Sequence, residues 1–113
     1  MISRKQFRLK LNKIYDVLCK HTDEVVSWDE AHLIPDMRLR YAIILAAVDD
    51  LYYGTDAEKL NAHQYLESAR FINESNILPI PEKWLNKIIY HPEQYAPEIQ
   101  EYDPQVAEND LLI

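Results

Sequence analysis

Two adjacent aspartates, Asp49 and Asp50, are the residues whose types and positions most suggest chemistry. They lie near the end of an apolar run that we expect to be helical, where the helix dipole disfavours negative charge. Paired carboxylates can bind a metal ion or act in acid–base catalysis. Neighbours on a helix point about 100° apart, however, so these two cannot form one site alone. We favour the simpler interpretation, in which one carboxylate is solvated and the other pairs with Arg40, Arg70 or a tyrosine hydroxyl.

His63 and Glu67 are four residues apart, a spacing that would let both bind one metal ion from one helix face. No second histidine at the proper spacing and no cysteine accompanies them, so a solvated pair is the better interpretation. The single cysteine, Cys19, is expected to be a buried or half-buried structural thiol. One glycine in the chain excludes a phosphate-binding loop, and the sequence has no nucleophile elbow and no Cys/His zinc pattern. We therefore expect a protein that is not an enzyme and that has no metal and no cofactor.

Composition points to one globular domain, because the chain has 113 residues, of which 48% are apolar. A lone cysteine excludes an internal disulfide and fits a reducing compartment. No signal peptide is visible, and no apolar run approaches the roughly 18 residues that span a bilayer. These features predict a cytoplasmic protein that does not enter membranes.

Charge is unevenly spread along the chain, whose net charge is −7. Residues 1–20 contain six lysines and arginines against one acid, whereas residues 91–113 contain six acids and no lysine or arginine. The basic segment includes Arg4, Lys5, Arg8 and Lys20, which we expect to form a solvated face rather than a binding site. The negative net charge argues against strong sequence-independent DNA binding, which depends on many lysine and arginine side chains.

The element that must position the two aspartates is the run from Arg40 to Tyr53. Its centre, Tyr41–Val48, is eight consecutive apolar residues, and its three alanines favour a helix over a buried strand. Asp36 is the expected N-cap, preceded by Pro35, and Gly54 is expected just after the helix. A helix that is apolar nearly all round is normally buried on most sides, so the other segments should pack around this one.

Three capping boxes predict where the surrounding helices begin. Ser3 with Gln6 predicts a first helix from Arg4 to about His21, and Thr55 with Glu58 predicts a long helix over residues 56–75. Ser27 with Glu30 predicts a short helix, with Trp28 as a core filler. Pro79 and Pro81 then form a rigid connector before a last short helix over residues 82–90. Its core-facing residues are expected to be Trp84, Leu85, Ile88 and Ile89.

The expected fold is therefore all-α. It is a compact bundle of four to five helices around a central apolar helix, residues 1–91, followed by an extended acidic C-terminal tail, residues 92–113. The absence of catalytic motifs and the polarised charge favour a regulatory or inhibitory protein that binds another macromolecule, with a protein as the expected partner. The residues expected to contact the partner are Tyr52, Tyr53, Tyr95, Glu98, Glu101, Tyr102 and Asp103.

Two other functions remain open from the sequence. Residues 56–90 can be interpreted as a helix–turn–helix DNA-binding regulator, in a dimer, that exposes Lys83, Asn86 and Lys87 on its second helix. Ordinary bundle packing explains the same pattern, and the connector is longer than usual and has no glycine. A metal-dependent enzyme using Asp49 or Asp50 with His63 and Glu67 is the alternative that the sequence favours least.

The runs AIILAAVDDL, AHQYLESARF and ILPIPEKWLNKI carry a family resemblance. From about Arg40 to Ile89 the chain resembles small proteins encoded by tailed phages and prophages. The residues in register are Asp50, Leu51, Tyr65, Leu66, Ser68 and Phe71. The chain departs from that group at Ser75, where many members have cysteine, and at Pro79 and Ile80, where glycine and aspartate are usual. The resemblance implies a phage origin and transfers no catalytic residue. A phage origin would make a host nucleic-acid-handling or defence protein a natural target.

Overall fold

The computed structural model describes residues 2–92, and this part of the chain is helical with no strand. The predicted all-α class is therefore confirmed for these residues. The helices are α1 (Arg4–Val25), the 3-10 helix η1 (Trp28–Leu33), α2 (Ile34–Tyr53), α3 (Asp56–Leu66), α4 (Ala69–Ser75) and α5 (Glu82–Tyr90). The predicted tail lies outside the described residues, apart from Pro92.

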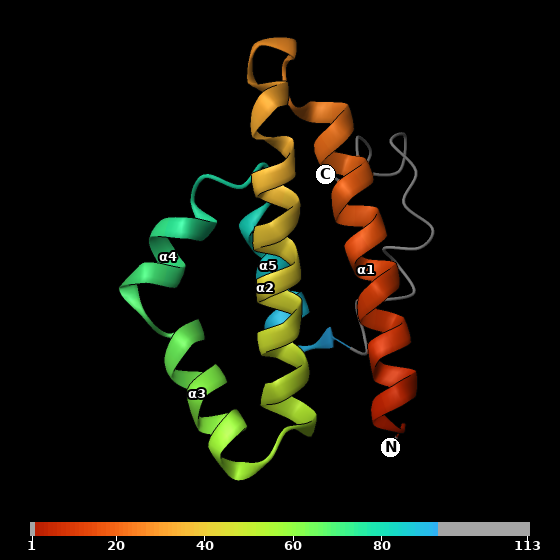
Figure 1. Ribbon diagram of the computed structural model, residues 1–113, viewed down its shortest axis with the longest axis vertical. Helices are drawn as coiled ribbons and strands as arrows, with labels where there is room; N and C mark the ends of the chain where they lie inside the picture. Colours follow the sequence, from red (N-terminus) through yellow and green to blue (C-terminus); the bar gives the residue numbers. More distant parts are fainter. Residues whose placement is uncertain (1, 93–113) are drawn as a thin grey trace.

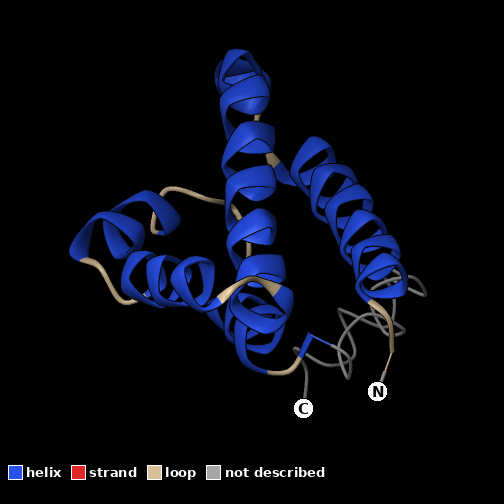
Figure 2. Cartoon of the chain, turned by 60° about the horizontal axis from the view of Figure 1, so that its bottom comes forward, coloured by secondary structure: helices blue, strands red, loops and turns tan. Residues whose placement is uncertain are grey.

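Helix α2 is the central element, as its composition predicts. In Figure 1 it runs through the middle of the molecule, with α1 on one side, α3 and α4 on the other, and α5 behind it. Figure 2 shows the same separation of α1 from the α3–α4 pair by α2. The buried core is drawn mainly from α1 (Phe7, Leu11, Ile14, Leu18), α2 (Met37, Tyr41, Ile44, Leu45, Val48) and α5 (Leu85, Ile88, Ile89).

Helix α2 is covered on fewer sides than we predicted. Ile44 and Leu45 are buried, but Ile43 is 45% exposed and Leu39 is 59% exposed. Because residues on a helix advance by about 100°, both exposed residues lie on the face turned away from the core. A helix that is apolar on every face is thus not buried on every face. Among the described residues, the face of α2 that carries Leu39 and Ile43 is open.

The two ends of α2 differ in detail from the prediction. The helix begins at Ile34 with Pro35 inside its first turn, where the missing N–H costs little, so Asp36 is a first-turn residue and not the N-cap. Gly54 ends the helix as predicted, but its φ of −74° is ordinary. A Cβ at Gly54 would lie 2.5 Å from the carbonyl oxygen of Asp50 and 2.8 Å from Cβ of Glu58. The glycine is therefore needed for close packing between α2 and α3.

Helix α1 begins at the predicted capping box, where the Ser3 hydroxyl accepts from the Gln6 amide and the Gln6 side chain accepts from the Ser3 amide. It continues past His21 to Val25. The buried Thr22 explains the extra turn, because its hydroxyl hydrogen bonds to the hydroxyl of Tyr41 inside the core. This bond ties the end of α1 to the first half of α2.

The long helix predicted over residues 56–75 is instead two helices. Ser68 interrupts it, since its hydroxyl accepts from the Phe71 amide and caps α4. After the break Phe71 is buried, whereas its neighbour Ile72 is 52% exposed. A local side-chain hydrogen bond outweighs continued helical periodicity here. No helix in the described part of the chain is long and apolar enough to span a bilayer.

Candidate functional site

The two aspartates singled out in the sequence form one half of an arginine clasp, which consists of Arg4, Arg8, Asp49 and Asp50. Arg4 Nη2 donates to Asp49 Oδ2 over 2.9 Å, and Arg8 Nε donates to the same oxygen over 3.0 Å. Arg4 also donates to Asp50 Oδ1 over 3.2 Å. Both carboxylates are therefore paired with the start of α1, which corrects the prediction that Arg40, Arg70 or a tyrosine would supply the partner.

The clasp also compensates for the unfavourable position of the aspartates on α2. Arg4 Nη1 donates to the backbone carbonyl of Tyr53, an oxygen of the last helical turn. A cation at this end offsets both the helix dipole and the two carboxylates. Hydrogen bonding to Asp49 raises the pKa of the Arg4 guanidinium, which keeps it charged. Arg4 and Arg8 are thus structural groups, while Lys5 and Lys20 remain exposed as predicted.

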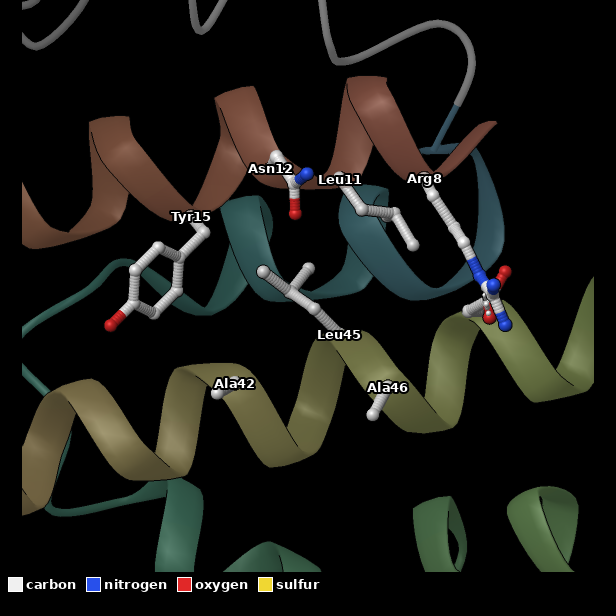
Figure 3. A pocket seen from close by; sticks show the side chains of 8 residues that line it. Arg8, Leu11, Asn12, Tyr15, Ala42, Leu45 and Ala46 are labelled. Atoms are coloured by element: carbon white, nitrogen blue, oxygen red, sulfur yellow. Dashed lines mark hydrogen bonds and ion pairs between the residues drawn. The ribbon is translucent and has the colours of Figure 1, made fainter. Parts of the chain in front are cut away.

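The clasp closes one end of a groove between α1 and α2, a hollow of about 490 Å³. Figure 3 shows Leu11 and Leu45 pointing toward each other across it, with Ala42 and Ala46 on the α2 side. The Asp49 side chain is only 10% exposed, and its Oδ1 is buried with no hydrogen-bond partner in the described structure. Away from the clasp, Asn12 and Tyr15 line the groove beside the apolar residues.

The two tyrosines predicted to contact a partner have structural roles. The Tyr52 hydroxyl donates to the Ile89 carbonyl over 2.6 Å, and the Tyr53 hydroxyl donates to the Ile2 carbonyl over 2.9 Å. Both rings also contact Phe7. Burial raises the pKa of the Tyr52 hydroxyl, which favours the protonated donor. These residues tie the end of α2 to α1 and α5, and their contact with a partner stays a prediction.

The other predicted partner contacts, Tyr95, Glu98, Glu101, Tyr102 and Asp103, lie outside the described residues. Lys83, Asn86 and Lys87, from the DNA-binding interpretation, are all exposed on α5. The core-facing residues predicted for the same helix are placed correctly, since Leu85, Ile88 and Ile89 are buried and Trp84 is half-buried.

His63 and Glu67 pair with each other across one helical turn, with 3.3 Å between Nε2 and Oε2, and both side chains are more than half exposed. The carboxylates of Asp49 and Asp50 bind arginines instead. Within residues 2–92 no group of three or more histidine, cysteine, aspartate or glutamate side chains is placed to hold a metal. Cys19 is half-buried as predicted, and burial raises the pKa of its thiol.

The surface that sequence reasoning missed is at the connection between α1 and α2. Trp28, predicted to fill the core, is 92% exposed at the start of η1. The predicted capping box does not form, because the Ser27 side chain makes no cap hydrogen bond, and η1 has no buried residue. The ring of Trp28 thus faces solvent from a 3-10 helix that has no buried residue.

Exposed acidic and apolar residues lie close to this tryptophan in the sequence. We call the group the Trp28 corner, and it comprises Asp23, Glu24, Val25, Trp28, Asp29, Glu30 and Leu33. All seven are exposed. Arg38 holds Asp23 through two 3.0 Å hydrogen bonds, which fixes the base of the corner to α2. The sequence does contain a signal: Asp29 and Glu30 directly follow Trp28, a polar neighbourhood that suits a surface better than a core.

Comparison of the chain with protein-family models, with curated proteins and with solved structures finds no match.

Proposed function

We propose that this chain is a non-enzymatic regulatory or inhibitory protein that acts by binding another protein, and that the Trp28 corner makes the principal contact. The single observation that carries the proposal is the tryptophan itself, 92% exposed on a short ordered helix. Tryptophan is enriched among the few interface residues that supply most of the binding energy. Val25 and Leu33, close to it in the sequence, are exposed apolar residues as well.

The chemistry of the corner favours a basic partner surface. Asp29 and Glu30 directly follow the tryptophan in η1, and Glu24 precedes it in α1, whereas Asp23 is already paired with Arg38. Acidic side chains around an aromatic ring attract lysine and arginine, and the ring face itself stabilises a cation. Opposite charges would also speed association with such a partner. The predicted acidic contacts at Glu98, Glu101 and Asp103 would add to the same attraction.

A basic surface is typical of a protein that handles nucleic acid, because such proteins neutralise phosphates. Together with the resemblance to phage-encoded proteins, this supports a host nucleic-acid-handling or defence protein as the target. The carboxylates of the corner would take the place of phosphates on that target, and the ring of Trp28 would take the place of a base. The function is then inhibition by occupation of a nucleic-acid-binding surface.

Affinity capture from the native host with matched variants tests this proposal. Trp28→Ala should reduce the captured partner at least tenfold, whereas Leu60→Ala, a substitution at another exposed apolar residue on α3, should leave capture unchanged. Capture of the same protein by wild type and Trp28→Ala in equal amounts would refute the role of the corner. The captured protein should also lose its nucleic acid when wild type is added.

Deletion of residues 93–113 tests the contribution of the predicted tail contacts. The deletion removes none of the helices described within residues 2–92, so far-ultraviolet circular dichroism should still show a folded helical protein. Partner binding should weaken, since six of the nineteen acids lie in this segment. Unchanged binding would remove the tail from the mechanism and leave the corner as the contact.

A DNA-binding function is the second candidate, favoured by the exposure of Lys83, Asn86 and Lys87 together on α5. Titration against duplex DNA at several salt concentrations separates the two functions. Affinity that falls steeply with salt and is lost in Lys83→Ala would favour DNA binding. Absence of binding at low salt would reject it.

A further inference from the structure

The outer face of α1 carries lysines that form no ion pair within residues 2–92. Every arginine of the chain is paired with an aspartate or a glutamate, and these arginines are Arg4, Arg8, Arg38, Arg40 and Arg70. We define the α1 lysine face by exposed residues three or four positions apart, which are Lys5, Leu9, Lys13, Asp16 and Lys20. Three lysines against one acid leave this face with a positive charge that the described part of the chain does not balance.

We infer that the α1 lysine face binds the acidic segment of the same chain, residues 93–113. The segment contains six acids and no lysine or arginine, so it holds most of the negative excess in a chain whose net charge is −7. It also contains three apolar residues in a row, and the lysine face offers Leu9, which is 54% exposed. The two surfaces are therefore complementary in charge and share an apolar contact.

The described chain ends close to the start of this face. Figure 1 and Figure 2 both show the end of α5 next to the N-terminal half of α1. The contacts agree, since the Ile89 carbonyl accepts from the Tyr52 hydroxyl, and the Tyr52 ring centroid lies 5.9 Å from that of Phe7 in α1. Only the width of one helix, about 10 Å, then separates the end of α5 from the outer face of α1.

The length of the segment suits the length of the face. Lys5 and Lys20 are about 22 Å apart along the axis of α1, because a helix rises about 1.5 Å per residue. Residues 93–113 span up to about 70 Å when extended, which is enough to pass around α1 and follow the whole face. Covalent attachment also gives the segment an effective concentration in the millimolar range, so that individually weak ion pairs suffice.

Other described surfaces fit an acidic segment less well. The groove between α4 and α5, a hollow of about 440 Å³, is lined by Glu67 and Glu82 and by no lysine, arginine or histidine. The Trp28 corner is acidic as well. Like charges at both places oppose the segment. Lys83 and Lys87 on α5 are the alternative cationic surface, and charge-reversal variants distinguish it from α1.

Docking changes what α1 presents to a partner. Six acids exceed the three lysines of the face, so the covered face is acidic instead of basic. An acidic α1 would add to the attraction for a basic partner, and this consequence alone rests on the proposed function. The docking itself is a property of the free chain and is tested without a partner.

Paramagnetic broadening in the full chain tests the docking. A nitroxide attached at Ala107→Cys, in a Cys19→Ser background, broadens the NMR signals of amides that lie near it. At low salt the exposed residues of α1 should be broadened, whereas those of α3, on the other side of α2, should not. Raising the salt from about 0.1 M to about 1 M shortens the Debye length from about 10 Å to about 3 Å, and should increase the α1 signals about twofold.

Charge reversal identifies the face. Lys5→Glu combined with Lys13→Glu should restore the α1 signals as fully as high salt does. Lys59→Glu combined with Lys83→Glu makes the same change of charge on exposed positions of α3 and α5, and should restore them little. Equal restoration by the two pairs would indicate attraction by net charge alone and overturn the proposal.

Two further outcomes would also overturn it. Absence of α1 broadening at low salt would show that the segment lies elsewhere. A mixture of nitroxide-labelled protein with unlabelled, isotope-enriched protein gives the second test, since the label and the observed α1 then belong to different molecules. Docking within one chain predicts no broadening in this mixture, and broadening equal to that of the singly labelled chain would indicate association between copies instead.

Discussion

The two ends of α2 are built in opposite ways. At its C-terminal end the arginine clasp, the two tyrosine hydroxyls and the ring of Phe7 bind α2 to α1 and α5. At its N-terminal end η1 contributes no buried residue and directs a tryptophan into solvent. The aspartates that suggested a catalytic site thus hold the fold, and the tryptophan that was predicted to fill the core is exposed to solvent.

This contrast predicts which substitutions affect stability. Phe7→Ala should have the largest effect, because Phe7 is 1% exposed and contacts the rings of Tyr52 and Tyr53 at the tied end of α2. The loss of this ring should lower the free energy of unfolding by about 3–4 kcal/mol. Urea unfolding followed by circular dichroism measures it, and a loss below about 1 kcal/mol would mean that this end is not firmly packed.

Asp49→Ala should have the second largest effect and lower the free energy of unfolding by about 2 kcal/mol. Asp49 accepts hydrogen bonds from two arginines and is largely buried. Asp50→Ala is the matched control. It removes the neighbouring carboxylate, which is more exposed and accepts only from Arg4, and should cost less than half as much. Equal losses of unfolding free energy in the two variants would show that the burial and second arginine of Asp49 add no stability to the clasp.

Acidification should produce a smaller effect through His21. Its Nε2 donates to the Pro79 carbonyl over 3.1 Å, and its ring contacts Trp84. Burial lowers the pKa of His21 below its ordinary value of 6.5, although the Pro79 hydrogen bond opposes this. The unfolded chain therefore binds a proton first as the pH falls. The stability that His21 contributes is fully present above about 6.5 and is lost as the pH falls through the depressed folded-state value.

The free energy of unfolding, measured at pH 7.5 and at pH 5.5, tests whether stability falls on acidification. Wild type should lose stability over that interval, and His21→Gln should lose less. His63→Gln is the control, since His63 is exposed and pairs only with Glu67 across one helical turn. An identical pH dependence in wild type and His21→Gln would contradict the assignment.

Trp28→Ala should have the smallest effect on stability, within about 0.5 kcal/mol of wild type, because an exposed ring loses little on truncation. The same variant is expected to lose partner binding, so the two measurements together separate structure from function at this residue. A large loss of stability would show that the ring packs against the rest of the fold. Both ends of α2 would then contribute to stability.

Local signals in the sequence predicted the elements well where the determining contacts are local. The capping boxes at Ser3 and Thr55 form as expected, and the residues predicted to face the core from α5 are buried or half-buried. These features depend on residues three or four apart, which the sequence displays directly. The same kind of signal failed at Ser27 and Ser68: the first cap does not form, and the second ends a helix that periodicity alone would continue.

Contacts between distant residues were decided by the tertiary structure alone. Arg4 and Asp49 are 45 positions apart, and nothing near either residue indicates the other. Likewise, the apolar composition of α2 determines that it is a core helix, but only the placement of α1, α3 and α5 leaves its fourth side open within residues 2–92. Sequence by itself therefore determined the all-α fold of residues 2–92 with its central apolar helix, and the acidic composition of the C-terminal residues. Which charges pair and which apolar residues reach solvent followed from how the helices are arranged, because burial and pairing depend on separation in space and not along the chain.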